Sequence, residues 1–413
     1  MTRIVRNMAS LGILQIANYV IPLLILPIIS RVLGATLFGS VSYAQNIVTY
    51  LTLLVNFGFE YSATRQIALA GEDIQKKTRI FWAVLTVKSL LLLLSFIILG
   101  LLPFCLGRIA SDPRLYLYTA LINVGIVLFP TWYLQGEQQM DKMALANFFI
   151  KLMGALLVIL LVREASAYRG YPLLLSLASF AGGVGALVYV IRHFHIGKYE
   201  CSRASLREVL SPSWPIFLNN LFGCLYTTVN MTILGLFAAD DVVGYFSASQ
   251  KLIMALIMII VLPVSTTIYP EISRRFESSK SEGVKFLKQV MLYAGLAAAV
   301  VSVFTFFIAP LAIRIVYGAG FTPAIEVLRW LAPIPFLVMM ATLLTIQGLY
   351  GMGLQRWAPW IGLTLAIICI SMNLILIPRI GVVAVCISWI VAEILECTFS
   401  GLVLLIHGRK ITR

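Results

Sequence analysis

Long apolar segments recur from end to end of this 413-residue sequence, and most charged residues lie in the short stretches between them. A helix of about 20 apolar residues crosses the hydrocarbon core of a bilayer. The chain is 60% hydrophobic and 12% charged, which is too little charge for the surface of a soluble protein of this size. Strands of a membrane barrel alternate polar and apolar residues, whereas these segments are continuously apolar. We therefore expect an all-α polytopic membrane protein.

Twelve apolar segments are long enough to form membrane-spanning helices. Their approximate ranges are 10–30, 40–60, 80–102, 115–134, 144–162, 171–192, 213–236, 243–268, 287–309, 330–349, 358–378 and 381–406. The basic stretch MTRIVRNMAS before the first segment imitates a signal peptide. The apolar run that follows continues through Ser30, which is longer than the hydrophobic region of a signal peptide, so we expect it to be kept as the first helix.

Basic residues are divided unequally between the two sides of the membrane that these helices define. Of the 31 Lys and Arg, 20 fall on the side of both termini, eight fall on the other side and three lie inside helices. The positive-inside rule then predicts that both termini are cytoplasmic. The net charge of +14 therefore indicates contact with membrane lipids and not with nucleic acid.

An internal repeat relates RVLGATLFGSVSYAQ (31–45) to LFAADDVVGYFSASQ (236–250), at an offset of 205 residues. The identical positions are Gly39 and Gly244, Ser42 and Ser247, and Gln45 and Gln250. Each stretch joins the first two helices of a six-helix half, and both halves enter the membrane from the same side because each has an even number of helices. We predict two pseudo-symmetric lobes (1–192 and 213–413) around a central cavity, with a cytoplasmic linker at 193–212.

Repeats of this kind are typical of transporters that work by alternating access, with the substrate bound between the lobes. Prolines inside the expected helices indicate bends or breaks, at Pro22, Pro27, Pro212, Pro215, Pro333 and Pro335. The small residues of AGGVG (181–185) predict close packing of the sixth helix.

Several motifs resemble those of the bacterial polysaccharide transporter family, the O-antigen flippases of the multidrug/oligosaccharidyl-lipid/polysaccharide exporter superfamily. The first of them is PIISRVLGATLFGSVSYAQNIVTYLTLLVNFGFEYSATRQIA (27–68). The others are TWYLQGEQQMDK (131–142), GYFSASQKL (244–252), IYPEISRRF (268–276) and GAGFTPAIEVLRWLAPIPF (318–336). The motifs follow in order across nearly the whole chain.

The resemblance implies twelve helices in two six-helix lobes around a V-shaped cavity, in the bacterial inner membrane. It implies a substrate, undecaprenyl-diphosphate carrying an O-antigen oligosaccharide, which is moved from the cytoplasmic to the periplasmic leaflet for lipopolysaccharide and surface polysaccharide synthesis. It also implies an O-antigen polymerase and a chain-length regulator as partners.

Three lysines, Lys88, Lys151 and Lys251, fall inside apolar segments. A charge at the centre of a membrane helix costs about 2.5–3.5 kcal/mol on insertion scales, so such residues are expected to face a cavity. A diphosphate needs positive partners there, and lysine binds phosphate as a point charge. Alternatively, each lysine lies close enough to a helix end to extend to the headgroups. Asn46, the repeat counterpart of Lys251, is also polar, which favours an inward face for both.

Two glutamates, Glu393 and Glu396, lie three residues apart and therefore on one face of the last helix. They either pair with a lysine, which we favour, or titrate with a coupling proton. Arg31 ends the first helix on the outer side, where it could meet the diphosphate, although we favour a role as an interfacial anchor.

A drug–cation antiporter of the same superfamily is the alternative function, and it would require carboxylates in the first lobe. The helices of that lobe carry Lys88 and Lys151, and their one carboxylate is Glu60 at a helix end, so an anionic substrate is favoured. No nucleophile–base constellation is present, and the outward connections are too short for a catalytic domain. We expect no enzyme activity and no cofactor. His193, His195 and Cys201 lie in a basic juxtamembrane stretch, so we expect a phospholipid-facing patch there and not a metal site.

Overall fold

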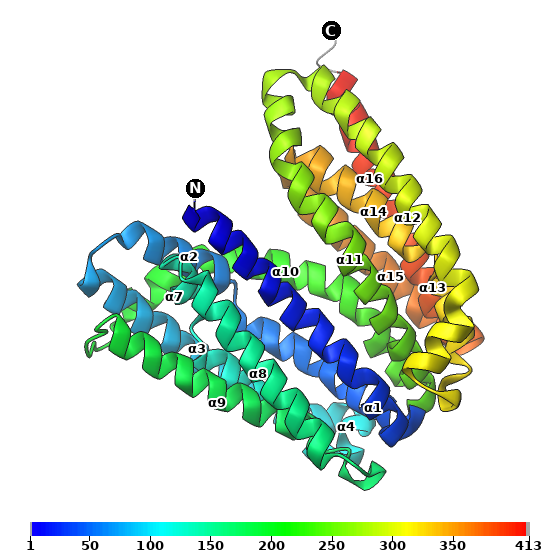
Figure 1. Cartoon of the computed structure of the whole chain (residues 1–413), viewed down its shortest axis with the longest axis horizontal. Helices are drawn as coiled ribbons and strands as arrows, with labels where there is room; N and C mark the ends of the chain where they lie inside the picture. Colours follow the sequence, from blue (N-terminus) through cyan, green and yellow to red (C-terminus); the bar gives the residue numbers. More distant parts are fainter. Residues whose placement is uncertain (1, 410–413) are drawn as a thin grey trace. The chain divides into compact units, whose positions relative to one another are not determined.

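Helices make up the secondary structure throughout residues 2–409, the part of the chain that the computed structural model describes (Figure 1). Side chains are described for residues 21–225 and 227–407, and no strand occurs in the described part. Helices are expected in lipid because each one satisfies its own backbone N–H and C=O groups. The chain divides into two units, Met1–Leu221 and Phe222–Arg413, here named unit 1 and unit 2.

Unit 1 begins with one long helix and contains several short ones. Its elements are α1 (Thr2–Asn56), α2 (Phe59–Ala70), α3 (Ile74–Cys105), α4 (Gly107–Ser111), α5 (Pro113–Ala120), α6 (Ile122–Leu128), α7 (Thr131–Gly136), α8 (Met140–Leu161), the short 3-10 helix η1 (Ala165–Ala167), α9 (Gly170–His193) and the first part of α10 (Arg203–Phe237).

Unit 2 begins inside α10 and contains two helices of more than 35 residues. Its elements after α10 are α11 (Asp240–Ser278), α12 (Lys280–Val316), the 3-10 helix η2 (Ala319–Phe321), α13 (Ala324–Leu331), α14 (Ile334–Thr342), the π-helix η3 (Leu343–Tyr350), the 3-10 helix η4 (Gln355–Trp357), α15 (Ala358–Ile380) and α16 (Val382–Arg409).

Ten helices in the described part are long and apolar enough to cross a membrane, and α10 makes an eleventh if its halves, bent by 47°, form one span. The first of the ten, Ile21–Ala70, has 50 residues, which is more than twice the length of about 20 residues that one crossing needs. Non-helical dihedral angles at Gly34 divide α1 there, so α1 contains the first predicted span and most of the second. The predicted all-α fold of about twelve membrane helices is confirmed.

The connections between predicted helices are shorter than expected in two places. Residues 31–39 form no loop, because α1 is interrupted only at Gly34, whose φ of 68° suits a residue without a side chain. Residues 269–286 are also helical, with Ser279 between α11 and α12. There Glu271 pairs with Arg275 at 2.7 Å, and the Arg275 guanidinium lies 4.0 Å from the ring centre of Phe286 on α12.

The fourth predicted helix of each half is broken into three pieces. The segment predicted at 115–134 forms α5, α6 and α7, and the segment predicted at 330–349 forms the end of α13, α14 and η3. Pro130 stands between α6 and α7, and Pro333 stands between α13 and α14. Proline lacks the N–H that continues a helix, which explains these two breaks, although the sequence predicted only the second.

The boundary between the two units lies after Leu221, inside α10. The first part of α10 packs on unit 1, because the Ser213 hydroxyl lies 2.6 Å from that of Ser62 and the Phe217 ring stacks on Phe57 at 4.6 Å. These contacts belong to the buried apolar cluster of unit 1, which extends to Trp132 and Tyr133.

Candidate functional site

The two repeat stretches occupy matching environments in their units. Gly39 and Ser42 in α1 are buried, as are their counterparts Gly244 and Ser247 in α11. Asn46 and Lys251, which the repeat also aligns, are both half-buried. The repeat that was read from the sequence therefore relates equivalent positions of the two units.

Lys88 of α3 is buried in unit 1, with 2% of its surface exposed. Its Nζ lies 3.3 Å from Oδ1 of Asn56 and 3.4 Å from the backbone oxygen of Ile126. Both acceptors are neutral, and the carboxylate that acts on Lys88 electrostatically is Glu60 at the start of α2. Unit 1 thus holds a cation among uncharged acceptors that come from α1 and α6.

Asn123 of α6 adds a further donor to the neighbourhood of α1 and α6. Its Oδ1 accepts a hydrogen bond of 2.7 Å from Oγ1 of Thr52, one helical turn before Asn56 in α1. Its Nδ2 is buried and has no hydrogen-bond partner among the described atoms. With the three donors of the ammonium group, this polar cluster is richer in donors than in acceptors, which suits an anionic ligand.

Lys151 of α8 is half-buried and forms no hydrogen bond or ion pair with the side chains that the structure describes. Arg31 is exposed in α1, shortly before Gly34. Lys88, Lys151, Arg31 and Asn46 therefore all lie in unit 1. The other predicted residues, Lys251, Glu393 and Glu396, lie in unit 2.

Glu393 and Glu396 of α16 are each held by an uncharged donor of unit 2. Trp389 donates its Nε1–H to Oε1 of Glu393 at 3.1 Å, and Thr345 donates its hydroxyl to Oε1 of Glu396 at 3.0 Å. Glu393 is 4% exposed. No described Lys or Arg forms an ion pair with Glu396, so for this residue the structure gives a threonine in place of the lysine that we favoured.

Thr345 lies in the π-helix η3, which sequence reasoning missed. Single turns of π-helix are frequent at functional sites. The Thr345 hydroxyl also lies 2.8 Å from the Ser400 hydroxyl. In the same π-helix the fully buried Gln347 donates its Nε2–H to the backbone oxygen of Ser265 at 2.9 Å. Oε1 of Gln347 has no partner among the described atoms. The π-helix thus connects α11 with α16 through polar contacts.

A second buried polar pair in unit 2 joins Asn230 of α10 to Asn373 of α15, with 2.6 Å between Nδ2 of Asn373 and Oδ1 of Asn230. Oδ1 of Asn373 and Oγ of Ser388 are buried without hydrogen-bond partners in the described part. The sequence signal was present, since an asparagine inside an apolar segment needs a partner.

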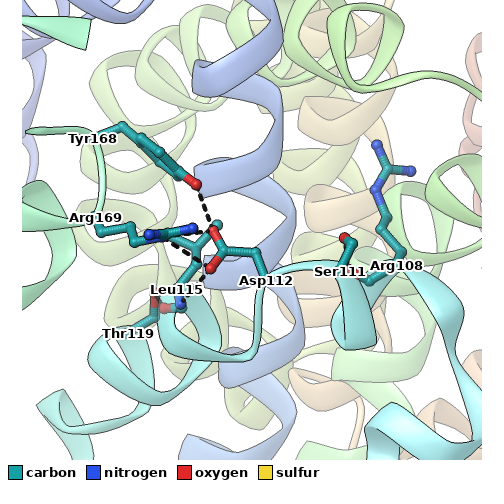
Figure 2. A network of polar contacts seen from close by, with 7 residues as sticks. All are labelled: Arg108, Ser111, Asp112, Leu115, Thr119, Tyr168 and Arg169. Atoms are coloured by element: carbon teal, nitrogen blue, oxygen red, sulfur yellow. Dashed lines mark hydrogen bonds and ion pairs between the residues drawn. The ribbon is translucent and has the colours of Figure 1, made fainter. Parts of the chain in front are cut away.

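A network around Asp112 joins two connections of unit 1 that are far apart in sequence (Figure 2). Tyr168 donates its hydroxyl to Oδ2 of Asp112 at 2.7 Å, and Nε of Arg169 lies 2.9 Å from Oδ1. Asp112 also accepts from the backbone N–H of Leu115 and so caps α5. Burial, followed by the hydrogen bond to Asp112, raises the pKa of Tyr168. In Figure 2 the side chain of Arg108 points away from Asp112.

No group of three or more His, Cys, Asp or Glu that could hold a metal ion occurs within the described residues. Unit 1 instead holds the buried cation Lys88 among neutral acceptors, and Glu396 of unit 2 accepts a hydrogen bond from a threonine.

Residues 4–276 match the family described as polysaccharide biosynthesis protein. The chain is 28% identical over 342 residues to a protein of Escherichia coli (strain K12) named as an O-antigen transporter, covering 83% of this chain and 82% of that protein. A protein of Shigella dysenteriae with the same name is 27% identical over 357 residues, covering 85% and 87%.

Among solved structures, the lipid II flippase MurJ in an inward closed conformation matches with a TM-score of 0.72, covering 96% of this chain and 87% of that one. An inward-facing multidrug resistance MATE family transporter of the MOP superfamily matches with a TM-score of 0.69, covering 98% and 99%. Both are 14% identical to this chain, so they establish the shared fold alone.

Proposed function

Because this chain belongs to the polysaccharide biosynthesis protein family, we propose that it is a flippase for lipid-linked O-antigen units. The substrate proposed is undecaprenyl-diphosphate carrying an oligosaccharide, moved from the cytoplasmic to the periplasmic leaflet of the inner membrane. The single observation that carries the proposal is the similarity to the Escherichia coli O-antigen transporter over four-fifths of both chains.

The charges of unit 1 support an anionic substrate. Lys88 and Lys151 lie inside its membrane helices, whereas the carboxylates Glu60 and Asp141 lie in the first turns of α2 and α8. The hydrogen-bond acceptors of Lys88 are neutral, Glu60 acts on it without forming an ion pair, and Nδ2 of Asn123 supplies an unused donor in α6. A diphosphate in a medium of low dielectric constant gains from such charges more than it would in water.

We propose a transport cycle of alternating access, in which the substrate site opens to one side of the membrane and then to the other while each unit keeps its internal packing. The positive-inside distribution supports cytoplasmic termini. An O-antigen polymerase and a chain-length regulator would take over the product on the periplasmic side. The work done on the substrate is binding and translocation, with no bond made or broken, so no enzyme activity is proposed.

The drug–cation antiporter gains no support from the described contacts. That function would use membrane carboxylates of unit 1, and the buried carboxylates Glu393 and Glu396 lie in unit 2. The similarity to multidrug transporters is one of fold.

A strain from which the gene is deleted tests the proposed function. We expect complete repeat units on the lipid carrier to accumulate in the cytoplasmic leaflet and surface polysaccharide to be lost, with both restored by the intact chain. Normal surface polysaccharide in the deletion strain would refute the proposal.

A further inference from the structure

An apolar groove with a volume of about 650 Å³ runs between α8 and α9 in unit 1. Leu145, Phe149 and Met153 of α8 line one wall, and each is more than a third exposed. Gly185 of α9 lies in the other wall. This volume lies within the range of about 300–1,000 Å³ that is typical of ligand pockets.

The groove contains small residues of α9, from the stretch AGGVG that predicted close packing of this helix. A Cβ added to Gly182 would lie 2.1 Å from Cγ1 of Ile150, so the two helices touch there. A Cβ added to Gly185, one turn later, would have no atom within 4 Å. The space above Gly185 is therefore open, and a larger side chain at that position would fill it.

One end of the groove is cationic. Lys142, in the first turn of α8, donates a hydrogen bond to the hydroxyl of Tyr189 and lies 5.0 Å from the centre of its ring. Tyr189 in turn donates to Oε1 of Gln139 at 3.1 Å. The ammonium group of Lys142 is exposed and keeps two N–H donors for another partner.

One face of α8 carries first the lysine Lys142 and then the apolar residues that line the groove. Lys142, Leu145, Phe149 and Met153 are spaced by three or four residues, which places them on one side of a helix. Eleven residues separate the first from the last, which is about 16 Å at 1.5 Å per residue. Half of the hydrocarbon core is about 15 Å thick. The groove therefore extends from the headgroup level to the middle of the bilayer.

We propose that this groove binds the polyprenyl chain of the substrate's lipid carrier, with the phosphate next to the chain held by Lys142. This inference rests on the proposed function. In a polyprenyl phosphate the phosphate is bonded directly to a single chain, and the groove likewise places its cation directly at the end of a single apolar channel. In a phospholipid a glycerol unit separates the phosphate from two chains.

The position of Lys151 gives this assignment a consequence for the headgroup. Lys151 follows Lys142 by nine residues, which at 3.6 residues per turn turns it to the opposite face of α8. Lys142 and Lys151 therefore cannot contact the same diphosphate at once, and with the lipid chain in this groove the phosphate lies at Lys142 and not at Lys151.

The test uses the full-length purified protein, with undecaprenyl phosphate and phosphatidylglycerol as probes and native mass spectrometry as the readout. Gly185→Leu fills the groove, and Gly100→Leu is the matched control because Gly100 of α3 is also exposed, with no atom within 4 Å of an added Cβ. Both changes favour the helix. We expect Gly185→Leu to weaken binding of undecaprenyl phosphate about tenfold or more, and Gly100→Leu to change it less than about twofold.

Lys142→Gln is also expected to weaken the binding of undecaprenyl phosphate. Phosphatidylglycerol is expected to bind equally to the wild type and to the three variants. Binding of undecaprenyl phosphate to Gly185→Leu at the wild-type level would overturn the proposal. Equal binding of phosphatidylglycerol to the groove of the wild type, lost in Gly185→Leu, would also overturn it, because the groove would then be a site for ordinary membrane lipid.

Expressing the same proteins in the deletion strain distinguishes a failure of the groove proposal from a failure of the proposed function. If the wild-type chain restores surface polysaccharide but Gly185→Leu and Gly100→Leu restore it equally, the function stands and the groove proposal fails. If the wild-type chain restores nothing, the proposed function itself fails.

Discussion

Unit 1 holds the cation Lys88 among neutral acceptors, whereas unit 2 holds the carboxylates Glu393 and Glu396 with neutral donors. The backbone differs much less between the units. In both, the fourth predicted helix is broken into three pieces and the aligned Gly39 and Gly244 are buried. The repeat has therefore kept these features of its architecture, while the most buried charge is a cation in unit 1 and a carboxylate in unit 2, where the cation Lys251 is half-buried.

This difference indicates a division of work. A charge inside a membrane helix costs about 2.5–3.5 kcal/mol on insertion scales, and the hydrogen bonds that hold Lys88 and Glu396 in the described part of the chain come from uncharged groups. Groups that are kept at such a cost are expected to act on something that enters and leaves. We expect the cation of unit 1 to act on the anionic substrate and the carboxylates of unit 2 to act on a coupling proton.

The largest effect is expected for Lys88→Met, which removes the charge of unit 1 and keeps the length of the side chain. Its neutral partners are left without a cation, and transport of the lipid-linked oligosaccharide is expected to fall about 100-fold. Leaving these two acceptors without a donor is expected to cost about 1–3 kcal/mol of stability, so transport is compared at equal amounts of folded protein. Initial transport rates in proteoliposomes measure the change.

Lys280→Met is the matched control, because Lys280 is exposed at the start of α12. It is expected to transport at the wild-type rate. Wild-type transport by Lys88→Met would show that the sign of the charge in unit 1 has no bearing on the substrate.

Glu396→Gln tests the other side of the comparison. We expect it to lower transport about tenfold and to remove the dependence of the rate on the proton gradient, because a glutamine cannot exchange a proton. Glu277→Gln, an exposed position near the end of α11, serves as the control. An unchanged response of Glu396→Gln to the gradient would exclude Glu396 as the coupling group.

Thr345→Val leaves the carboxylate of Glu396 in place and removes its hydroxyl donor in the π-helix. One lost hydrogen bond corresponds to about 1 kcal/mol, so we expect about a fivefold loss of transport and a proton dependence that is shifted but present. Loss of the proton dependence in Thr345→Val would show that the hydroxyl, and not the carboxylate alone, carries the coupling.

Substitutions of Asp112 are expected to have a smaller effect, on the thermal stability of the protein and not on transport. Asp112→Ala removes the cap of α5, which costs about 1 kcal/mol, together with the contacts to Tyr168 and Arg169. Asp112→Asn keeps a capping residue and loses only the charge. We therefore expect the thermal midpoint in detergent to fall further for Asp112→Ala than for Asp112→Asn, and the reverse order would contradict the cap.

The smallest effect concerns alkaline pH. The pKa of Tyr168 is raised above its ordinary value of 10.0, so the folded state favours the protonated phenol. This contribution is complete below the ordinary pKa of tyrosine and is lost as the pH rises through the raised value. Chemical unfolding is expected to show a loss of stability above pH 10.0 that is reduced in Tyr168→Phe, and equal profiles would contradict it.

The all-helical fold and the approximate number of helices could be predicted from the apolar segments of the sequence. The contacts of the charged groups inside the membrane helices could not. Lys88 meets Asn56 and Ile126, which lie 32 and 38 residues away in the sequence. Hydropathy places a lysine at a depth in the membrane and says nothing about which neighbouring helix turns a carbonyl or an amide toward it.

The breaks in the helices were predictable only in part. Pro333 identified one of them and Gly34 lies in the predicted connection between the first two spans, but Leu121 divides α5 from α6 inside apolar sequence. The boundary at Leu221 carries no signal in the sequence, since α10 continues through it as a helix.

The most direct test of the central claim is the movement of purified undecaprenyl-diphosphate oligosaccharide across the membrane of proteoliposomes that contain this protein alone. The account predicts that the lipid-linked sugar becomes accessible on the opposite leaflet, and that Lys88→Met slows this while Lys280→Met does not. Failure of the wild-type protein to move the lipid-linked sugar, with the protein folded and correctly inserted, would contradict it.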